Sequence, residues 1–156
     1  MKSRLGVGIV LAVLVTGSLV YAFGRRGEAA FQPMLVPAGG ELGSEMTVYF
    51  FDTDVRCDTC LRIEAYAYEV VTTQYAEDYN AGRIGWMKLD LDAPENAHFA
   101  EDFGLYTKSV VLVEHDAAGV PVRWKNLDKV WDLVGDHTAY ADYVATSIQA
   151  FRKEAM

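Results

Sequence analysis

The chain has 156 residues, of which 51% are hydrophobic, and its formal net charge is −8. From Ser44 onward it carries 20 acidic and 10 basic side chains, so this part is more acidic than the whole. Nucleic-acid phosphates need a basic surface, and the charge therefore argues against nucleic acid as a partner.

The chain opens on a long apolar stretch. Residues 5–23 are 19 residues without a charged side chain, and basic residues flank them on both sides. At about 1.5 Å per residue this length crosses a bilayer, and it exceeds the roughly 7–15 residues of a signal-peptide core. We predict an uncleaved transmembrane anchor within residues 1–27. A cleavable signal is the alternative, while three glycines and almost no polar face disfavour a buried globular helix.

Because basic residues flank both ends of the stretch, the positive-inside rule says little about its orientation in the membrane. A short tail before a single span usually stays inside, so we expect the domain to be extracytoplasmic, in the periplasm. A secreted and a cytoplasm-facing domain are the alternatives. Residues 28–44 contain two prolines and three glycines without a convincing period, and we interpret them as a flexible linker. Residues 45–156 are then long enough for one packed domain.

The first half of this domain alternates between strand and helix patterns. Met46–Phe51 is a short apolar, aromatic run that ends at acidic residues, which predicts a buried strand. Apolar residues at helical spacing predict a helix over Asp58–Tyr79, and Gly82 is well placed just beyond its end. Ile84–Leu91 is a second predicted strand. A short helix follows over Pro94–Phe103, since proline is tolerated in a first turn.

The second half predicts a hairpin and a closing helix. Ser109–Val113 is the most strand-like stretch of the chain, and Asp116–Gly119 supplies a turn before a partner strand at Val120–Trp124. A short helix is predicted over Leu127–Val134, and a longer amphipathic helix over Thr138–Arg152.

The element order β-α-β-α-β-β-α predicts an α/β fold. A crossover helix makes the first two strands parallel, and the hairpin adds on the other side of the first strand. The result is a central four-stranded mixed sheet flanked by helices. Functional sites of such sheets lie at the carboxyl ends of the strands.

The two cysteines of the chain, Cys57 and Cys60, lie between the first strand and the first helix. A helix N-terminus stabilises a thiolate, which is the attacking species in disulfide exchange, and Arg56 adds positive charge while Asp58 opposes it. We assign Cys57 as the exposed nucleophile and Cys60 as the resolving thiol. A local structural disulfide or two idle thiols are the alternative readings.

Metal and cofactor motifs are absent from the sequence. A structural zinc site wants four ligands and only one cysteine pair is present. His98, His115 and His137 fall on separate elements, so we interpret them as surface or core-edge residues. There is no GxGxxG motif and no P-loop, so we expect no bound cofactor and no metal.

With this pattern, the chain over Glu45–Met156 resembles the thioredoxin-like superfamily. It differs from thioredoxin in the residues around the cysteines, which are Arg56 in place of tryptophan and Asp58-Thr59 between the pair. The proline expected before the third strand is also replaced, in the segment Thr107–Val110. A cis bond without proline costs roughly 3 kcal/mol, so we expect a trans peptide there.

A further difference from thioredoxin is that the buried acid that assists proton transfer is missing. Phe51 stands six residues before Cys57, where thioredoxins carry that acid. Asp52 or Asp54 would replace it only if the end of the strand bends inward.

A narrower resemblance is to a small bacterial family of nitrophenyl-compound nitroreductase subunits, which are thioredoxin-like and carry arsenic-resistance-type names. The matching segments are Arg56–Cys60, Asp90–Phe99, Tyr106–Ser109 and Arg123–Trp131. The resemblance implies a partner enzyme that carries the cofactor, with Cys57 and Cys60 passing electrons.

The loop before the third strand completes the predicted site. We expect Lys108 and Ser109 to lie near the dithiol, where the charge of Lys108 would stabilise a Cys57 thiolate. An exposed lysine on a loop is the alternative. Trp124 and Trp131 are interpreted as packing residues rather than as a docking surface.

Three functions remain open at this point. The first is a membrane-tethered thiol–disulfide oxidoreductase that works on a protein redox partner. The second is a dithiol protein that binds soft ions such as arsenite or copper(I). The third is a non-catalytic interaction subunit that keeps the fold.

Overall fold

The structure is a computed structural model, and it describes residues 45–55 and 57–154. One sheet runs through this part of the chain in the strand order β2-β1-β3-β4. Its strands are β1 (Met46–Asp52), β2 (Ile84–Asp90), β3 (Ser109–His115) and β4 (Pro121–Asn126). β1 runs parallel to β2 and antiparallel to β3, and β3 pairs antiparallel with β4. The sheet is thus four-stranded and mixed, as predicted, and its order is consistent with a thioredoxin-like fold.

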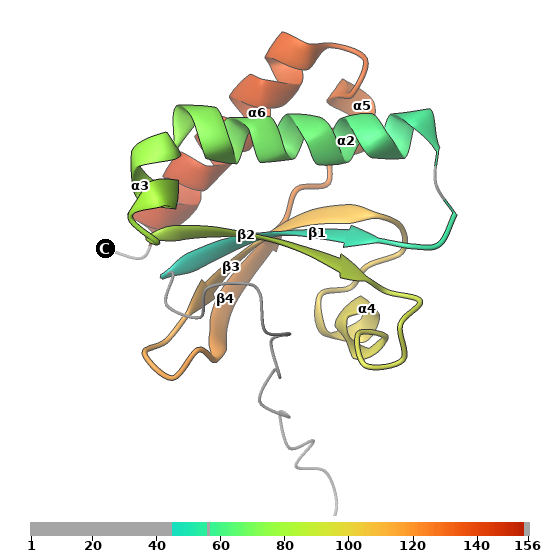
Figure 1. Cartoon of the computed structure of the whole chain (residues 1–156), viewed down its shortest axis with the longest axis horizontal. Helices are drawn as coiled ribbons and strands as arrows, with labels where there is room; N and C mark the ends of the chain where they lie inside the picture. The colour runs from blue at the N-terminus through green and yellow to red at the C-terminus, as the bar shows by residue number, and fades with distance from the viewer. Residues whose placement is uncertain (1–44, 56, 155–156) are drawn as a thin grey trace, which may run out of the picture. The chain divides into compact units, whose positions relative to one another are not determined.

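Helices cover both faces of the sheet (Figure 1). They are α2 (Asp58–Glu69), η1 (Val70–Gln74), α3 (Ala76–Asn80), α4 (His98–Asp102), α5 (Val130–Leu133) and α6 (His137–Lys153). Figure 1 shows α2, α5 and α6 on one face and α4 on the other. The sequence therefore predicted the helices in the correct order, with two differences.

The first difference lies in the long helix after the dithiol, which is not uniform. Its middle, Val70–Gln74, is a π-helix, and a short α-helix follows. The segment contains four β-branched residues in a row, which lose rotamer freedom in an α-helix. The hydroxyls of Thr72 and Thr73 also donate to backbone carbonyls one turn earlier, Thr73 to Glu69 at 2.7 Å. We attribute the wider turn to this combination.

The second difference is the start of the next helix. It begins at His98 rather than at Pro94, and residues 91–97 form turns. The side-chain amide of Asn96 donates to the carbonyl of Asp90 at 2.8 Å, which ties these turns to the end of β2.

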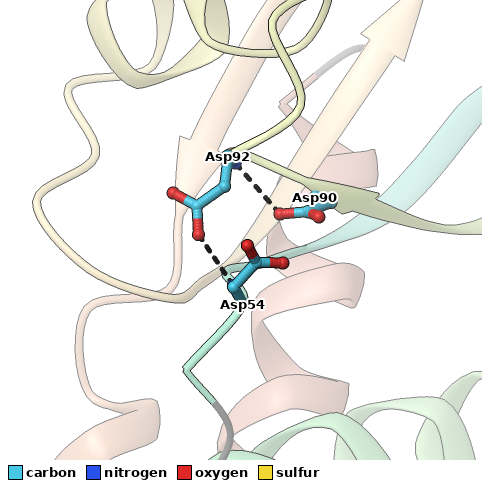
Figure 2. Close-up of side chains that lie close together, drawn as sticks. All are labelled: Asp54, Asp90 and Asp92. Atoms are coloured by element: carbon cyan, nitrogen blue, oxygen red, sulfur yellow. Dashed lines mark hydrogen bonds between the residues drawn. The ribbon is translucent and has the colours of Figure 1, made fainter.

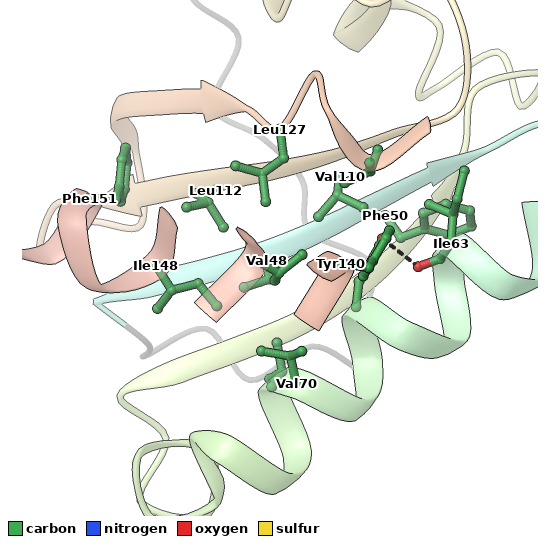
Figure 3. Close-up of a cluster of buried hydrophobic side chains, with 14 of the residues drawn as sticks. Val48, Phe50, Ile63, Val70, Val110, Leu112, Leu127, Tyr140, Ile148 and Phe151 are labelled. Atoms are coloured by element: carbon green, nitrogen blue, oxygen red, sulfur yellow. Dashed lines mark hydrogen bonds between the residues drawn. The ribbon is translucent and has the colours of Figure 1, made fainter. Parts of the chain in front are cut away.

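The larger core lies between the sheet and the helices α2 and α6 (Figure 3). Val48, Phe50 and Leu112 from the sheet meet Ile63 of α2, and all four are fully buried. Tyr140 of α6 donates its hydroxyl hydrogen to the carbonyl of Ile63 at 2.8 Å, so the two helices are also joined by a buried hydrogen bond. This core fixes the helix that begins at the cysteines.

The opposite face carries a smaller, more aromatic core. The rings of Phe51, Phe99 and Phe103 contact one another with centroid distances of 5.4 to 5.7 Å. Tyr49 stacks on Phe51 on the same face. Because Phe51 and Phe50 are neighbours in β1, alternate side chains of this strand enter the two cores.

The membrane anchor predicted within residues 1–27 and the linker predicted at 28–44 lie outside the described residues. Among residues 45–55 and 57–154, no helix combines the length and the apolar character that a membrane span requires.

Candidate functional site

Cys57 and Cys60 form a disulfide at the N-terminus of α2, just beyond the end of β1. Cys57 has an extended backbone and caps the helix, because its sulfur accepts the backbone N–H of Cys60 at 3.1 Å. Its Cα lies 5.1 Å from that of Cys60. The positive end of the helix dipole points at this sulfur and would favour its anion in the reduced state.

The two cysteines differ in exposure. Cys57 is exposed, whereas Cys60 is only 5% exposed and packs in the first turn of α2. Of the two sulfur-bearing residues, Cys57 is therefore the one that solvent reaches. Arg56, which was predicted to add charge here, lies outside the described residues.

A buried ion pair lies at the end of β1. The Lys108 ammonium contacts the Asp52 carboxylate at 2.5 Å, and both residues are 5% exposed. Lys108 also donates to the carbonyl of Thr53 at 3.1 Å. The loop before β3 is thus attached to the strand end that leads into the dithiol.

The charged cluster continues across β2 to α2. The ammonium of Lys88 lies 3.0 Å from the second oxygen of Asp52 and 2.6 Å from the carboxylate of Glu64. Glu64 follows Cys60 by four residues on the same helix, so the two share a face of α2. We call Lys108, Asp52, Lys88 and Glu64 the charged cluster; it alternates in sign and adds to zero net charge.

Electrostatics keeps Asp52 ionised. Burial raises the pKa of this carboxyl, but hydrogen bonds from Lys108 and then Lys88 outweigh burial. The backbone N–H of Thr53 adds a further hydrogen bond at 2.9 Å. Together they lower the pKa of Asp52 to about 2.

The loop before β3 is held by hydrogen bonds of its own. The indole N–H of Trp131 donates to the carbonyl of Lys108 at 2.9 Å. The hydroxyl of Ser109 donates to the carbonyl of Thr107 at 2.8 Å. Every peptide bond in the described ranges is trans, the one before Ser109 included, as the missing proline led us to expect.

The two predicted site residues of this loop make different contacts. Lys108 is buried and paired with Asp52, and Ser109 is buried with its hydroxyl turned toward its own loop. Sequence reasoning did not single out Lys88, although a lysine between apolar neighbours in a predicted strand was a usable signal. It considered Asp52 only as a conditional substitute.

Three aspartates meet at the rim of this end of the sheet, and Figure 2 shows them. One carboxylate oxygen from each of Asp54, Asp90 and Asp92 lies within 4.8 Å of the others, and all three residues are exposed. The backbone N–H of Asp54 donates to Asp92 at 2.7 Å, and the N–H of Asp92 donates to Asp90 at 3.0 Å. These two hydrogen bonds between loop backbone and side chains explain why the three aspartates lie close together.

The histidines are not members of that trio. His98 pairs with Asp102 at 2.7 Å on the surface of α4. His137 pairs with Glu69 at 3.0 Å, between α6 and α2. His115 is half-buried beside Tyr49, and burial lowers its pKa.

Comparison with known proteins adds little to this geometry. No family model matches the chain, and no curated protein matches it. A solved structure described as that of a malarial protein is similar at a TM-score of 0.36 with 18% identity, over 60% of this chain and 98% of that one. The solution structure of a thioredoxin from Thermus thermophilus is similar at 0.34 with 14% identity, over 53% of this chain and 58% of the thioredoxin.

Likenesses this weak carry no argument about activity. The fold assignment therefore depends on the sheet order, and the site depends on its own residues. The narrower resemblance to nitrophenyl-compound nitroreductase subunits finds no support among these comparisons.

Proposed function

We propose that this protein is a thiol–disulfide oxidoreductase in which Cys57 is the nucleophile and Cys60 the resolving thiol. The observation that carries the proposal is the Cys57–Cys60 disulfide at the start of α2, with one exposed and one buried member. A disulfide in a helix's first turn exposes one sulfur to a partner and keeps the second within reach for release.

The reduced protein would exchange with a disulfide of a partner in two steps. The thiolate of Cys57 attacks one partner sulfur, the partner's S–S bond breaks, and the leaving sulfur takes a proton. Cys60, as a thiolate, then attacks the sulfur of Cys57 and releases the partner's other sulfur. The products are the Cys57–Cys60 disulfide and a partner dithiol, so two electrons have moved to the partner. The reverse sequence oxidises a partner.

The charged cluster supports this chemistry in the proposal. Lys108 and Lys88 bring two ammonium groups to the strand end before Cys57, where the carboxylates of Asp52 and Glu64 balance them. The proposal assigns Lys108 the role of favouring the thiolate of Cys57 through its positive charge. Ser109 fixes the loop that carries Lys108.

We further propose that the protein works at a membrane. The uncharged stretch at residues 5–23 supports a membrane-anchored protein with its domain on the extracytoplasmic side. Without a cofactor motif in the chain, electrons would come from or go to a partner protein, and a cofactor-bearing nitroreductase is one partner of that kind.

Trapping variants of the full chain test the proposal. Reduced Cys60→Ser, mixed with oxidised glutathione, should accumulate a mixed disulfide at Cys57, because no resolving thiol remains. Cys57→Ser should accumulate far less, because Cys60 is buried. Mass spectrometry of the intact protein measures both, with the double serine variant as control. Equal labelling of the two single variants would contradict the assigned roles.

The soft-ion alternative predicts a different pattern in the same variants. Arsenite would bind the reduced pair, and either single serine substitution would remove that binding, because one thiol no longer chelates the ion. The interaction-subunit alternative predicts no effect of either substitution on partner binding.

A further inference from the structure

A groove lies between the outer side of α2 and the strand β2. It has a volume of about 330 Å³ and is lined by Leu61, Glu64, Ala65, Tyr68 and Trp86. We call it the α2–β2 groove. Leu61 directly follows Cys60, so the groove begins beside the dithiol and runs along the helix away from it.

The walls of the groove are apolar and partly exposed. Leu61 is 45% exposed and Tyr68 is 44% exposed, although both are large apolar side chains. Tyr68 meets the half-buried Trp86 edge to face, with ring centroids 5.4 Å apart. Exposed aromatic side chains next to one another are enriched at the centres of binding surfaces.

One charged group lines the groove, and it is an acid. The carboxylate of Glu64 is 27% exposed and accepts a hydrogen bond from Lys88 at 2.6 Å. The faces of tryptophan and tyrosine rings also attract cations. With 20 acidic against 10 basic side chains from Ser44 onward, the long-range field of the domain favours a cationic ligand as well.

The sheet edge beside the groove suits an extended segment. In the part of the chain that the structure describes, β2 pairs with β1 on one side and forms the end of the sheet. A peptide lying along an edge strand gains main-chain hydrogen bonds, while its alternate side chains enter neighbouring pockets.

We propose that the α2–β2 groove receives an extended segment of the redox partner that carries an apolar side chain next to a lysine or arginine. The apolar side chain packs on Tyr68 and Trp86, and the cation faces Glu64. This proposal rests on the proposed thiol–disulfide function, because the groove would then hold the partner while its disulfide reacts at Cys57.

Two matched peptides test the groove without any thiol. The probes are fluorescein-labelled Gly-Arg-Leu-Lys-Phe-Gly and its acidic twin Gly-Glu-Leu-Glu-Phe-Gly, and fluorescence anisotropy with the full chain in neutral detergent micelles measures binding. We expect the basic peptide to bind at least about tenfold more tightly than the acidic one. Glu64→Gln should weaken the basic peptide by about three- to tenfold, and Tyr68→Ser by about tenfold.

Glu101→Gln is the matched control, because Glu101 is an exposed acid on α4, on the other face of the sheet. It removes the same charge and should leave binding unchanged. Equal affinity for the two peptides, or an equal loss in the control, would overturn the proposal. A groove that faces lipid would instead show quenching by brominated lipid of a fluorescence component that Trp86→Phe removes, and that result overturns it too.

A second experiment separates this proposal from the proposed function. Mixed disulfides of the two peptides, each extended by one cysteine joined to glutathione, are offered to the reduced full chain. The basic form should react about tenfold faster. Binding without reaction of either form refutes the oxidoreductase proposal and leaves the groove. Equal reaction of both forms without binding refutes the groove and leaves the oxidoreductase.

Discussion

β1 is buried along its whole length, but its two ends are buried by different kinds of neighbours. Toward its start, Met46, Val48 and Phe50 pack in the larger apolar core and Tyr49 packs in the smaller one. Asp52, at the other end, is buried against the ammonium groups of Lys88 and Lys108. Burying apolar surface stabilises a fold, whereas burying ions costs free energy that only good pairing offsets. The charged end is therefore poorly explained by stability, and it is the end next to the disulfide.

The largest effect should come from breaking the charged end. Asp52→Asn leaves two lysines without their shared anion and should lower the free energy of unfolding by about 3–5 kcal/mol. Urea unfolding of the full chain measures this. After correction for the unfolded fraction, we expect disulfide exchange to become faster, because the charge of Lys108 is no longer balanced by the Asp52 anion and favours the Cys57 thiolate more strongly.

Two variants sharpen the contrast. Leu112→Ala, in the apolar core, should cost about 3 kcal/mol but leave the exchange rate of the folded protein unchanged. The triple variant Asp52→Leu, Lys88→Met, Lys108→Met should regain most of the stability lost in Asp52→Asn, because apolar replacements of buried ions are often neutral or stabilising. If the triple variant also exchanges at the normal rate, the charged cluster has no role in the chemistry.

Acidification should lower the free energy of unfolding by an intermediate amount. The folded-state pKa of Asp52 is about 2, below its ordinary value of 3.8, so its contribution to stability is complete above about pH 4. As the pH falls from 3.8 toward 2, that contribution is lost, and it amounts to about 2 kcal/mol. Unfolding free energies at pH 5 and pH 2.5 measure it. The triple variant should lose less stability over this interval, and an equal loss in both proteins would assign the acid sensitivity elsewhere.

The smallest effect should come from the loop that carries Lys108. Trp131→Phe removes the indole N–H that donates to the Lys108 carbonyl, which should cost about 1 kcal/mol. Tyr143→Phe is the control, because it removes an exposed hydrogen bond to Asp128 and should cost less. A larger loss in the control, measured by urea unfolding, would show that the Trp131 bond does not hold the loop.

The order of elements was predictable because its patterns are strong and local. Met46–Phe51 and Ser109–Val113 are dense apolar runs, and the long helices show clear apolar stripes. The start of α4 was missed because a side-chain bond from Asn96 to the end of β2 replaces the first helical turn with loop turns. The π-helix at Val70–Gln74 was missed because the same apolar stripe fits both kinds of helix.

The site was only partly predictable. Spacing to the cysteine pointed to Phe51, but that side chain enters the aromatic core on the α4 face. Alternation along the strand places Asp52 on the same face as Phe50, where α2 lies. Alternation therefore indicated the acidic site residue better than the spacing to the cysteine. The partners of Asp52 are distant in sequence, on β2 and before β3, so only the folded chain brings Lys88 and Lys108 together.

The central position of β1 has a consequence for motion. Its backbone is hydrogen-bonded to β2 on one side and β3 on the other, so its amides exchange with solvent only when a neighbouring strand also opens. The strand that leads to the disulfide is thus held with nearly the stability of the whole sheet. Among the described residues, any rearrangement that accompanies opening or closing of the disulfide therefore falls on residues 53–55 and on the first turn of α2.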